Sequence, residues 1–324
     1  MKTLFLGGLA ARVMPRILEK MSERLEAAAL ADLGDTQQLI PALAEAEIVV
    51  GHIWRPDFPP APRLKLLQAA TAGLDMIDLP SLPRGVAVCN VFGHEPAIAE
   101  YVLMTWLALT HRLIDTVSEF RAGSWAAHQP AGGSPHGEVL GRTLGIVGYG
   151  RIGREVARRA KAFGCTIVAA NRSPVTEPGD AAEIYPLDKL DRMLPACDAL
   201  LIAAGLGPET RGLMDARRLS LMKPRAVLIN IGRAAIVDEA ALYTALRDGM
   251  IGGAALDVWW QHWSPEHPDR RGSRLPFHEL PNVLMTPHCS GFTEGTADRR
   301  WGELAGNLDR YVRGDAPINL VTIT

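Results

Sequence analysis

The stretch "TLGIVGYGRIGREVARRAKAFGCTIVAANRSP", residues 143–174, constrains the fold more than any other part of the chain. A β-forming run ends at Gly148, and the spacing Gly148-x-Gly150-x-x-Gly153 leads into a helix-forming run and a second β-forming run. Such glycines permit a tight turn and a close approach of the backbone to a pyrophosphate, while the helix N-terminus supplies N–H donors. Three glycines alone also occur in ordinary turns, but this flanking order predicts a dinucleotide-binding βαβ unit. The cofactor-binding residues predicted for this turn are Gly148, Tyr149, Gly150, Arg151, Ile152 and Gly153.

The end of the second β-forming run bears on the choice of cofactor. A site for NAD usually has an Asp or Glu about 20 residues after the glycines, which binds the ribose 2′-OH. This chain has Asn171 there, followed by Arg172 and Ser173. The lack of an acid removes repulsion against a 2′-phosphate, and an adjacent arginine can pair with that phosphate. These three residues favour NADP(H), and NAD(H) is the alternative if Arg172 is a solvated surface residue.

Segments that favour strand and helix alternate along the whole chain, which is typical of βαβ units around a largely parallel sheet. With 324 residues, of which 48% are hydrophobic, the chain is long enough for two domains with separate cores. We predict two doubly wound α/β domains. The substrate domain comprises residues 1–96 plus 291–324, and the dinucleotide-binding domain comprises residues 97–290. A single helix is expected over residues 95–121, closed by Gly123.

Charge and cysteine content exclude several classes of partner. The net charge of −2 and the lack of a long charged run give no electrostatic reason to bind nucleic acid or an anionic membrane, so a small molecule is the expected partner. The four cysteines form no CxxC pair and indicate neither a disulfide framework nor a metal site. The most apolar helical run, residues 98–109, contains Glu100 and is shorter than the ~20 residues that a bilayer requires. We therefore expect a cytoplasmic protein without a bound metal.

Two polar residues stand where a parallel sheet places its ligands. Arg233 and His288 each directly follow a buried β-forming run, at the carboxyl edge of the predicted sheet. An arginine that binds a carboxylate and a histidine that exchanges a proton, both near a nicotinamide, suit hydride transfer to a 2-oxo acid. Taken singly, each has a structural alternative: Arg233 could pair with Asp238, and His288 could cap a turn.

Ordered motifs extend over nearly the whole chain: "TAGLDMID", "AIAEYVL", "RAGSW", "LGRTLGIVGYGRIG", "NIGRAAIVDEAAL", "GGAALDVW" and "NVLMTPHCSG". With them the chain resembles the D-2-hydroxyacid dehydrogenase family, which includes glyoxylate/hydroxypyruvate reductases, phosphoglycerate dehydrogenase and formate dehydrogenase. The resemblance implies a cofactor domain inserted in the substrate domain, a cleft between the two, and a homodimer built through the cofactor domain.

The resemblance also implies roles for individual residues. Arg233 would bind the substrate carboxylate and oxo oxygen, and His288 would be the acid that protonates that oxygen during reduction. Asp257 would be the supporting acid near Arg233 and, with Gly232, would contact the cofactor. The backbone N–H groups implied to hold the substrate carboxylate belong to Ala72, Gly73 and Leu74.

The chain departs from the family pattern around the site. Ala234 replaces the usual Gly after the catalytic Arg, and Ala203 and Gly205 replace the His and Pro of the segment beside the nicotinamide. The largest departure is His262, which occupies the position of the catalytic Glu, five residues after Asp257. In the family this Glu favours the charged form of the catalytic His, so here we expect the pKa of His288 to lie closer to its reference value of about 6.5.

Three explanations of the missing Glu remain open. Glu266 could reach back and restore the pair. His262 or Gln261 could act as a neutral hydrogen-bond partner of His288, as the Gln of formate dehydrogenases suggests. Alternatively, catalysis is weak or lost, and the protein is a cofactor-binding module like the family's corepressors. We favour the second explanation with 2-oxo acid chemistry retained, and formate-dehydrogenase-like oxidation is the alternative enzyme activity.

Two further groups of residues have both a functional and a structural interpretation. Trp259 and Trp260 either form a wall of the substrate pocket or pack beneath the loop that follows them. His52, Trp54 and Arg55 follow a β-forming run of the substrate domain, where one of them could select the substrate or all could have surface roles.

Overall fold

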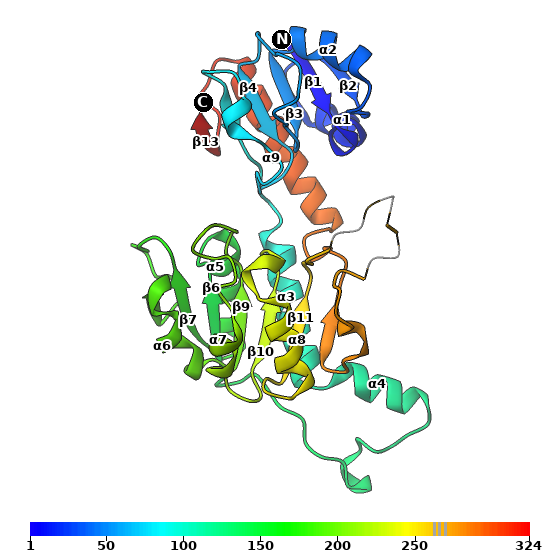
Figure 1. Cartoon of the computed structure of the whole chain (residues 1–324), viewed down its shortest axis with the longest axis vertical. Coiled ribbons are helices and arrows are strands. Elements are labelled where there is room, and N and C mark those ends of the chain that lie inside the picture. The colour runs from blue at the N-terminus through cyan, green and yellow to red at the C-terminus, as the bar shows by residue number, and fades with distance from the viewer. Residues whose placement is uncertain (262–263, 265–266, 269–270) are drawn as a thin grey trace. The chain divides into compact units, whose positions relative to one another are not determined.

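The computed structural model describes residues 1–261, 264, 267–268 and 271–324. It divides the chain into two compact units, Met1–His94 with Thr293–Thr324, and Glu95–Phe292 (Figure 1). The sequence-based domain boundaries lie two residues from these two crossings.

The first unit is built on a six-stranded sheet with the strand order β13-β5-β4-β3-β1-β2. All neighbouring strands pair in parallel except β13, which runs antiparallel to β5. The strands are β1 Lys2–Leu6, β2 Glu26–Leu30, β3 Ile48–Gly51, β4 Leu66–Ala69, β5 Ala87–Cys89 and β13 Leu320–Ile323. The helices are α1 Gly8–Lys20, α2 Thr36–Glu45, η1 Leu79–Ser81 and α9 Glu294–Val312.

The second unit contains a seven-stranded, fully parallel sheet with the order β12-β11-β10-β9-β6-β7-β8. The order reverses between β6 and β9, which is the crevice where doubly wound folds bind ligands. Its strands are β6 Thr143–Val147, β7 Thr166–Asn171, β8 Glu183–Pro186, β9 Ala199–Ile202, β10 Val227–Asn230, β11 Gly253–Leu256 and β12 Val283–Met285. Its α-helices are α3 Glu95–Thr110, α4 Leu113–Arg121, α5 Arg151–Ala162, α6 Leu190–Met193, α7 Ala216–Ser220 and α8 Glu239–Arg247. Short 3-10 turns are η2 Gln129–Ala131, η3 Leu187–Lys189, η4 Leu194–Ala196, η5 Ala234–Ile236 and η6 Phe277–Glu279.

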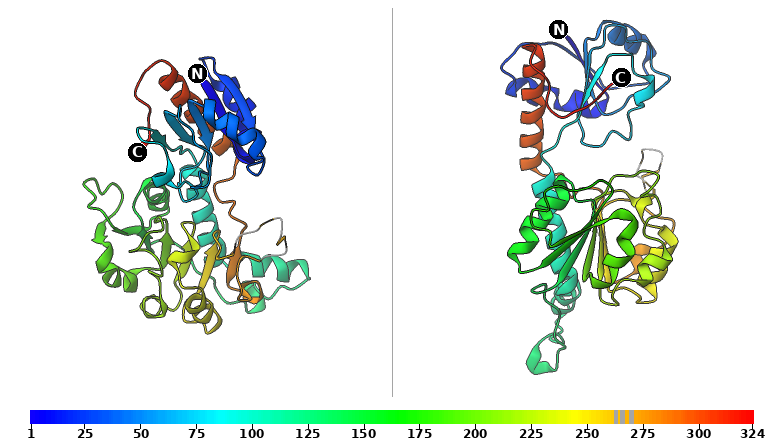
Figure 2. Two further views of the ribbon diagram at one scale, coloured as in Figure 1. Left: turned by 45° about the horizontal axis from the view of Figure 1, so that its top comes forward. Right: turned by 90° about the vertical axis from the view of Figure 1, so that its left-hand side faces the viewer.

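Successive residues of the second unit's strands enter two different cores, one on each face of the sheet. Leu200 packs with residues of α6, α7 and α8, whereas its neighbour Leu201 packs with residues of α3 and α5. Figure 2 shows helices on both sides of this sheet. Because both faces are buried, the strands are apolar throughout rather than alternating.

The first unit has the same two-faced arrangement. Leu4 and Leu6 of β1 enter one core, and Phe5 enters the other. The second of these cores is completed by Trp301 and Leu304 of α9, which join it from a segment that lies nearly 300 residues later in the chain.

The structure differs from the sequence-based expectation in two respects. The single helix expected over residues 95–121 is two helices, because Arg112 has a left-handed backbone conformation with φ of 50°. Gly123, with φ of 84°, ends the second of them as expected. The strands β2 and β8 were not expected. The segment "EAAAL" of β2 has a composition that favours helix, and its strand conformation depends on pairing with β1.

Among the helices of the described residues, none combines the length and the apolar character required to cross a bilayer.

Candidate active site

The three glycines between β6 and α5 meet three different structural requirements. Gly148 has φ of 95°, and a Cβ there would lie 2.6 Å from the backbone nitrogen of Ala204. A Cβ at Gly153 would lie 2.5 Å from the carbonyl oxygen of Gly148. The helix α5 can therefore approach the end of β6 this closely only because residue 153 has no side chain. A Cβ at Gly150 would meet no atom of the described residues within 4 Å, so the turn is open at this point. A tight turn, close helix packing and an open backbone face are the features that admit a pyrophosphate.

The predicted ribose-side residues are organised by Asn171. Its Oδ1 accepts a hydrogen bond from the backbone N–H of Tyr149 at 3.1 Å, and its Nδ2 donates to the carbonyl oxygen of Ser173 at 2.9 Å. Asn171 therefore links the glycine turn to the loop after β7. Arg172 is exposed, and its guanidinium lies 3.8 Å from the carboxylate of Glu209.

Arg233 is carried by a turn that the buried side chain of Asn230 holds in place. Asn230 Oδ1 accepts from the N–H of Gly232 at 3.1 Å, and its Nδ2 donates to the carbonyl oxygen of Arg233 at 3.2 Å. Arg233 is half-buried, and its Nη1 donates to the carbonyl oxygen of Gly232 at 2.8 Å. Asp238, the alternative partner of Arg233, instead accepts from the N–H of Ala241 and caps α8.

The loops after β6, β9 and β10 meet closely at Ala204. A Cβ at Gly232 would lie 2.7 Å from the carbonyl oxygen of Ala204, on whose backbone a side chain at Gly148 would also clash. Ala203 and Gly205, which occupy the family's His and Pro positions, flank this contact point. The predicted cofactor residues Gly148 and Gly232 are therefore brought together, although they lie 84 positions apart in the sequence.

Asp257 holds the turn that carries His288. The carboxylate is fully buried and accepts hydrogen bonds from Thr286 Oγ1 at 2.6 Å and from the N–H groups of Cys289 at 2.8 Å and Ser290 at 2.9 Å. The resemblance implies that Asp257 supports Arg233. In the described part of the chain, all hydrogen bonds of this carboxylate go to the His288 turn instead.

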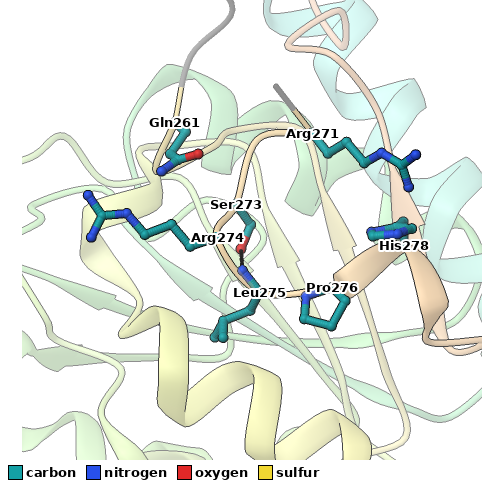
Figure 3. Close-up of a pocket in the computed structure, with 7 residues that line it drawn as sticks. All are labelled: Gln261, Arg271, Ser273, Arg274, Leu275, Pro276 and His278. Carbon is teal, nitrogen blue, oxygen red and sulfur yellow. Dashed lines mark hydrogen bonds between the residues drawn. The ribbon is translucent and has the colours of Figure 1, made fainter. Parts of the chain in front are cut away.

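The proposed substitutes for the missing Glu are only partly described. His262 and Glu266 lie outside the described residues. Gln261 is described: its backbone N–H donates to the carbonyl oxygen of Gly272 at 2.9 Å. Its side chain lines an open cavity of about 300 Å³ with Arg271, Arg274 and His278 (Figure 3). None of the predicted catalytic side chains Arg233, Asp257 and His288 lines this cavity, so it is not the predicted site.

The two tryptophans after β11 have packing roles. Trp259 is buried, and its Nε1 donates to the carbonyl oxygen of Thr286 at 2.8 Å. Trp260 stacks on Phe277 with ring centroids 5.6 Å apart, and its Nε1 donates to Val237 at 3.1 Å. Both side chains therefore anchor the segment between β11 and β12, in agreement with the structural interpretation.

The predicted carboxylate-binding loop lies in the first unit, directly after β4. Asn90 Nδ2 donates to the carbonyl oxygen of Ala72 at 2.9 Å, and Thr71 Oγ1 donates to that of Gly73 at 2.9 Å. These two hydrogen bonds involve the carbonyl oxygens of Ala72 and Gly73. The backbone N–H groups of residues 72–74 donate no hydrogen bond to any described residue. Backbone N–H groups that lack an acceptor in the protein can donate hydrogen bonds to an anion.

The loop after the neighbouring strand β3 contains two buried nitrogen atoms that lack a hydrogen-bond partner among the described residues. They are His52 Nδ1 and Trp54 Nε1. Burial also lowers the pKa of His52, so this imidazole favours its neutral form. A polar ligand that reached this loop would satisfy atoms that the protein alone leaves unsatisfied.

Sequence reasoning missed two residues that support the site. Asn230 and Thr286 are polar residues at the ends of apolar strands, and their side chains hold the turns of Arg233 and His288, respectively. Their position at strand ends is a signal in the sequence, but their partners can be identified only from the structure.

Comparisons with known proteins agree with this geometry. The family model described as the NAD-binding domain of D-isomer specific 2-hydroxyacid dehydrogenases matches residues 103–290. Glyoxylate reductase from Thermococcus onnurineus is 37% identical over 274 residues, which cover 82% of this chain and 78% of that protein. Glycerate dehydrogenase from Methylorubrum extorquens is 32% identical over 267 residues, covering 80% and 79%. The structure of an NADPH-dependent glyoxylate/hydroxypyruvate reductase from Sinorhizobium meliloti, in complex with citrate, matches with a TM-score of 0.77 at 26% identity, covering 100% of this chain and 97% of that one.

The glycine turn predicts different results for two identical substitutions. Gly150→Ala should leave the free energy of unfolding unchanged, because its Cβ enters open space, but should weaken dinucleotide binding by about tenfold, or 1.4 kcal/mol. Gly153→Ala should lower the free energy of unfolding by about 1–3 kcal/mol, because its Cβ meets a carbonyl oxygen. Chemical denaturation and fluorescence titration with NADPH measure the two quantities. Equal losses of stability in the two variants would contradict this assignment.

Proposed function

Because the chain belongs to the D-isomer specific 2-hydroxyacid dehydrogenase family, we propose that it reduces a small 2-oxo acid with NADPH, as a reductase of the glyoxylate/hydroxypyruvate type. Its class is that of an oxidoreductase acting on 2-hydroxy acids. The observation that carries the finer proposal is the common edge of one parallel sheet. The glycine turn follows β6, Arg233 follows β10 and His288 follows β12, so a cofactor and an acid substrate can be bound together.

Each residue at this edge has a chemical task in the proposed reaction. The Arg233 guanidinium binds the substrate carboxylate and orients the oxo group. His288 donates a proton to the oxo oxygen as the carbonyl is reduced, and takes it back in the reverse direction. NADPH, when bound, supplies the hydride that reduces the carbonyl carbon. We propose His262 as the neutral hydrogen-bond partner of His288.

The described residues suit a phosphorylated dinucleotide. The open backbone at Gly150 and the start of α5 provide N–H donors for a pyrophosphate. Asn171 carries no charge that would repel a 2′-phosphate, and Arg172 next to it is exposed and cationic. Glu209, near that guanidinium, would compete with the phosphate for it. We propose NADP(H) as the preferred cofactor, with Glu209 limiting the preference.

A panel of 2-oxo acids tests the proposed activity. Glyoxylate, hydroxypyruvate, pyruvate and phenylpyruvate are mixed with the protein and NADPH, and absorbance at the reduced nicotinamide band is followed between about pH 5 and 8, around the reference pKa of histidine. We expect turnover of at least one acid, and a loss of about 100-fold or more in kcat for His288→Asn. His278→Asn, the same change at an exposed histidine that precedes β12, is the control. NADPH binding without turnover of any acid would favour a non-catalytic binding module.

Cofactor choice is tested at the Arg172–Glu209 pair. Arg172→Ala should lower kcat/KM for NADPH by about tenfold and leave that for NADH nearly unchanged, since only NADPH has the phosphate. Glu209→Gln should raise kcat/KM for NADPH severalfold relative to NADH by removing the competing carboxylate. A parallel loss for both cofactors in Arg172→Ala would refute the proposed role of this arginine.

We further propose a homodimer that uses α4 of the second unit. Leu113, Ile114, Val117 and Phe120 of this helix are all exposed and are spaced so that they share one face. Trp125, which is 61% exposed, follows in the same segment and packs edge-on against Phe120. A contiguous apolar helix face of this kind is typical of a protein–protein interface, and a second copy is the partner that the family resemblance suggests.

Sedimentation of one α4 variant tests the dimer. Phe120→Asp should shift the protein from dimer to monomer at micromolar concentration, because it inserts a charge in the centre of the apolar face. Met250→Asp introduces the same charge at another exposed apolar residue and should leave the dimer intact. A wild-type protein that sediments as a monomer would exclude the proposed assembly.

A further inference from the structure

The turn that carries His288 is held in an unfavourable backbone conformation. His288 has φ of 56°, in the left-handed region that residues other than glycine rarely adopt. Such a conformation is energetically unfavourable and persists only where neighbouring contacts fix it. The conformation determines the direction in which the imidazole leaves the backbone.

The contacts that fix this turn lie on both sides of His288. Before it, Thr286 donates through Oγ1 to Asp257 and accepts at its carbonyl oxygen from Trp259 Nε1. After it, the N–H groups of Cys289 and Ser290 donate to the same carboxylate. One buried anion thus holds the chain at three points around a single residue.

A fourth side chain completes this arrangement from α3. The hydroxyl oxygen of Tyr101 lies 2.6 Å from Thr286 Oγ1. The threonine hydroxyl has one proton, which it must donate to Asp257, because a carboxylate can only accept. Tyr101 is therefore the donor and Thr286 the acceptor in this hydrogen bond. Burial raises the pKa of Tyr101 to about 12, so its hydroxyl keeps the proton it donates at neutral pH.

We propose that Tyr101 is a positioning residue for His288, which acts through the directed chain of hydrogen bonds from Tyr101 to Thr286 to Asp257. The donor from α3 fixes the threonine rotamer and thereby the carboxylate that holds the N–H groups beyond His288. The proposal rests on the proposed function insofar as His288 is the acid, but the hydrogen-bond chain can be tested without turnover. Tyr101 itself is buried within the core beneath the sheet and does not act on the substrate directly.

Two pairs of variants separate positioning from general stability. Tyr101→Phe removes only the hydroxyl, and Tyr243→Phe is its control, since the Tyr243 hydroxyl makes no hydrogen bond within the described part of the chain. Thr286→Val removes the relay while keeping the side-chain shape, and Thr286→Ser restores a hydroxyl at the same position.

The first measurement is amide hydrogen exchange of Cys289 and Ser290, which does not require activity. Tyr101→Phe and Thr286→Val should accelerate exchange of these two amides by about three- to tenfold, whereas Tyr243→Phe and Thr286→Ser should not. Unchanged exchange at both amides in Tyr101→Phe would overturn the proposal. This result stands whether or not the protein reduces 2-oxo acids, so it distinguishes the failure of the positioning role from that of the proposed function.

The second measurement is kinetic, with the acid that gives turnover. Tyr101→Phe should lower kcat by about three- to tenfold with the NADPH dissociation constant unchanged, because the displaced group acts in the chemical step. If Tyr101 acts only through Thr286, the Tyr101→Phe change should have no further effect in the Thr286→Val background. Multiplicative losses in the double variant would show that Tyr101 acts by another route and would overturn the relay.

Discussion

The close approach of three loops around Ala204 is the constraint on which the cofactor side of the second unit depends. The turn after β6 and the turn after β10 both contact the backbone of this residue, and a Cβ at Gly148 or Gly232 would occupy the same space. This contact brings Gly148 and Gly232, which lie 84 positions apart in the sequence, into one crevice at the point where the strand order reverses. It also explains why small residues occupy this edge, since a side chain at the contact would separate the strands.

A second constraint acts at the other end of the same edge, where Asp257 is buried without a cationic partner in its hydrogen-bond set. Three donors compensate the loss of hydration, and each belongs to the turn around His288. The carboxylate and the strained histidine therefore depend on each other: the turn satisfies the charge, and the charge maintains the turn. The donors to Asp257 are Thr286, Cys289 and Ser290, and none of them belongs to the loop that contains His262.

Sequence reasoning was most successful where the requirement is local. The glycine spacing identified the turn because φ at Gly148 and the packing of Gly153 depend on a few neighbouring residues. Sequence reasoning missed β2, because its alanines favour a helix and only the pairing with β1 makes the segment a strand. It also missed Tyr101 as a partner of Thr286, since 185 residues separate the two, and assigned Asp257 to the arginine rather than to the histidine turn. Side-chain hydrogen bonds between distant segments leave no periodic pattern in a sequence.

The path of the chain through the first unit has a consequence for synthesis on the ribosome. Residues 1–94 are synthesised before the second unit, whereas the helix α9 that covers one face of their sheet, and the strand β13 at its edge, are synthesised after it. The second unit is continuous in sequence and can fold while those segments are still being made. Until then, Phe5, Ile48 and Val50 lack their partners from α9, and the edge of β5 is unpaired. During this interval the first unit exposes apolar side chains and a strand edge, which are features that favour aggregation and chaperone binding.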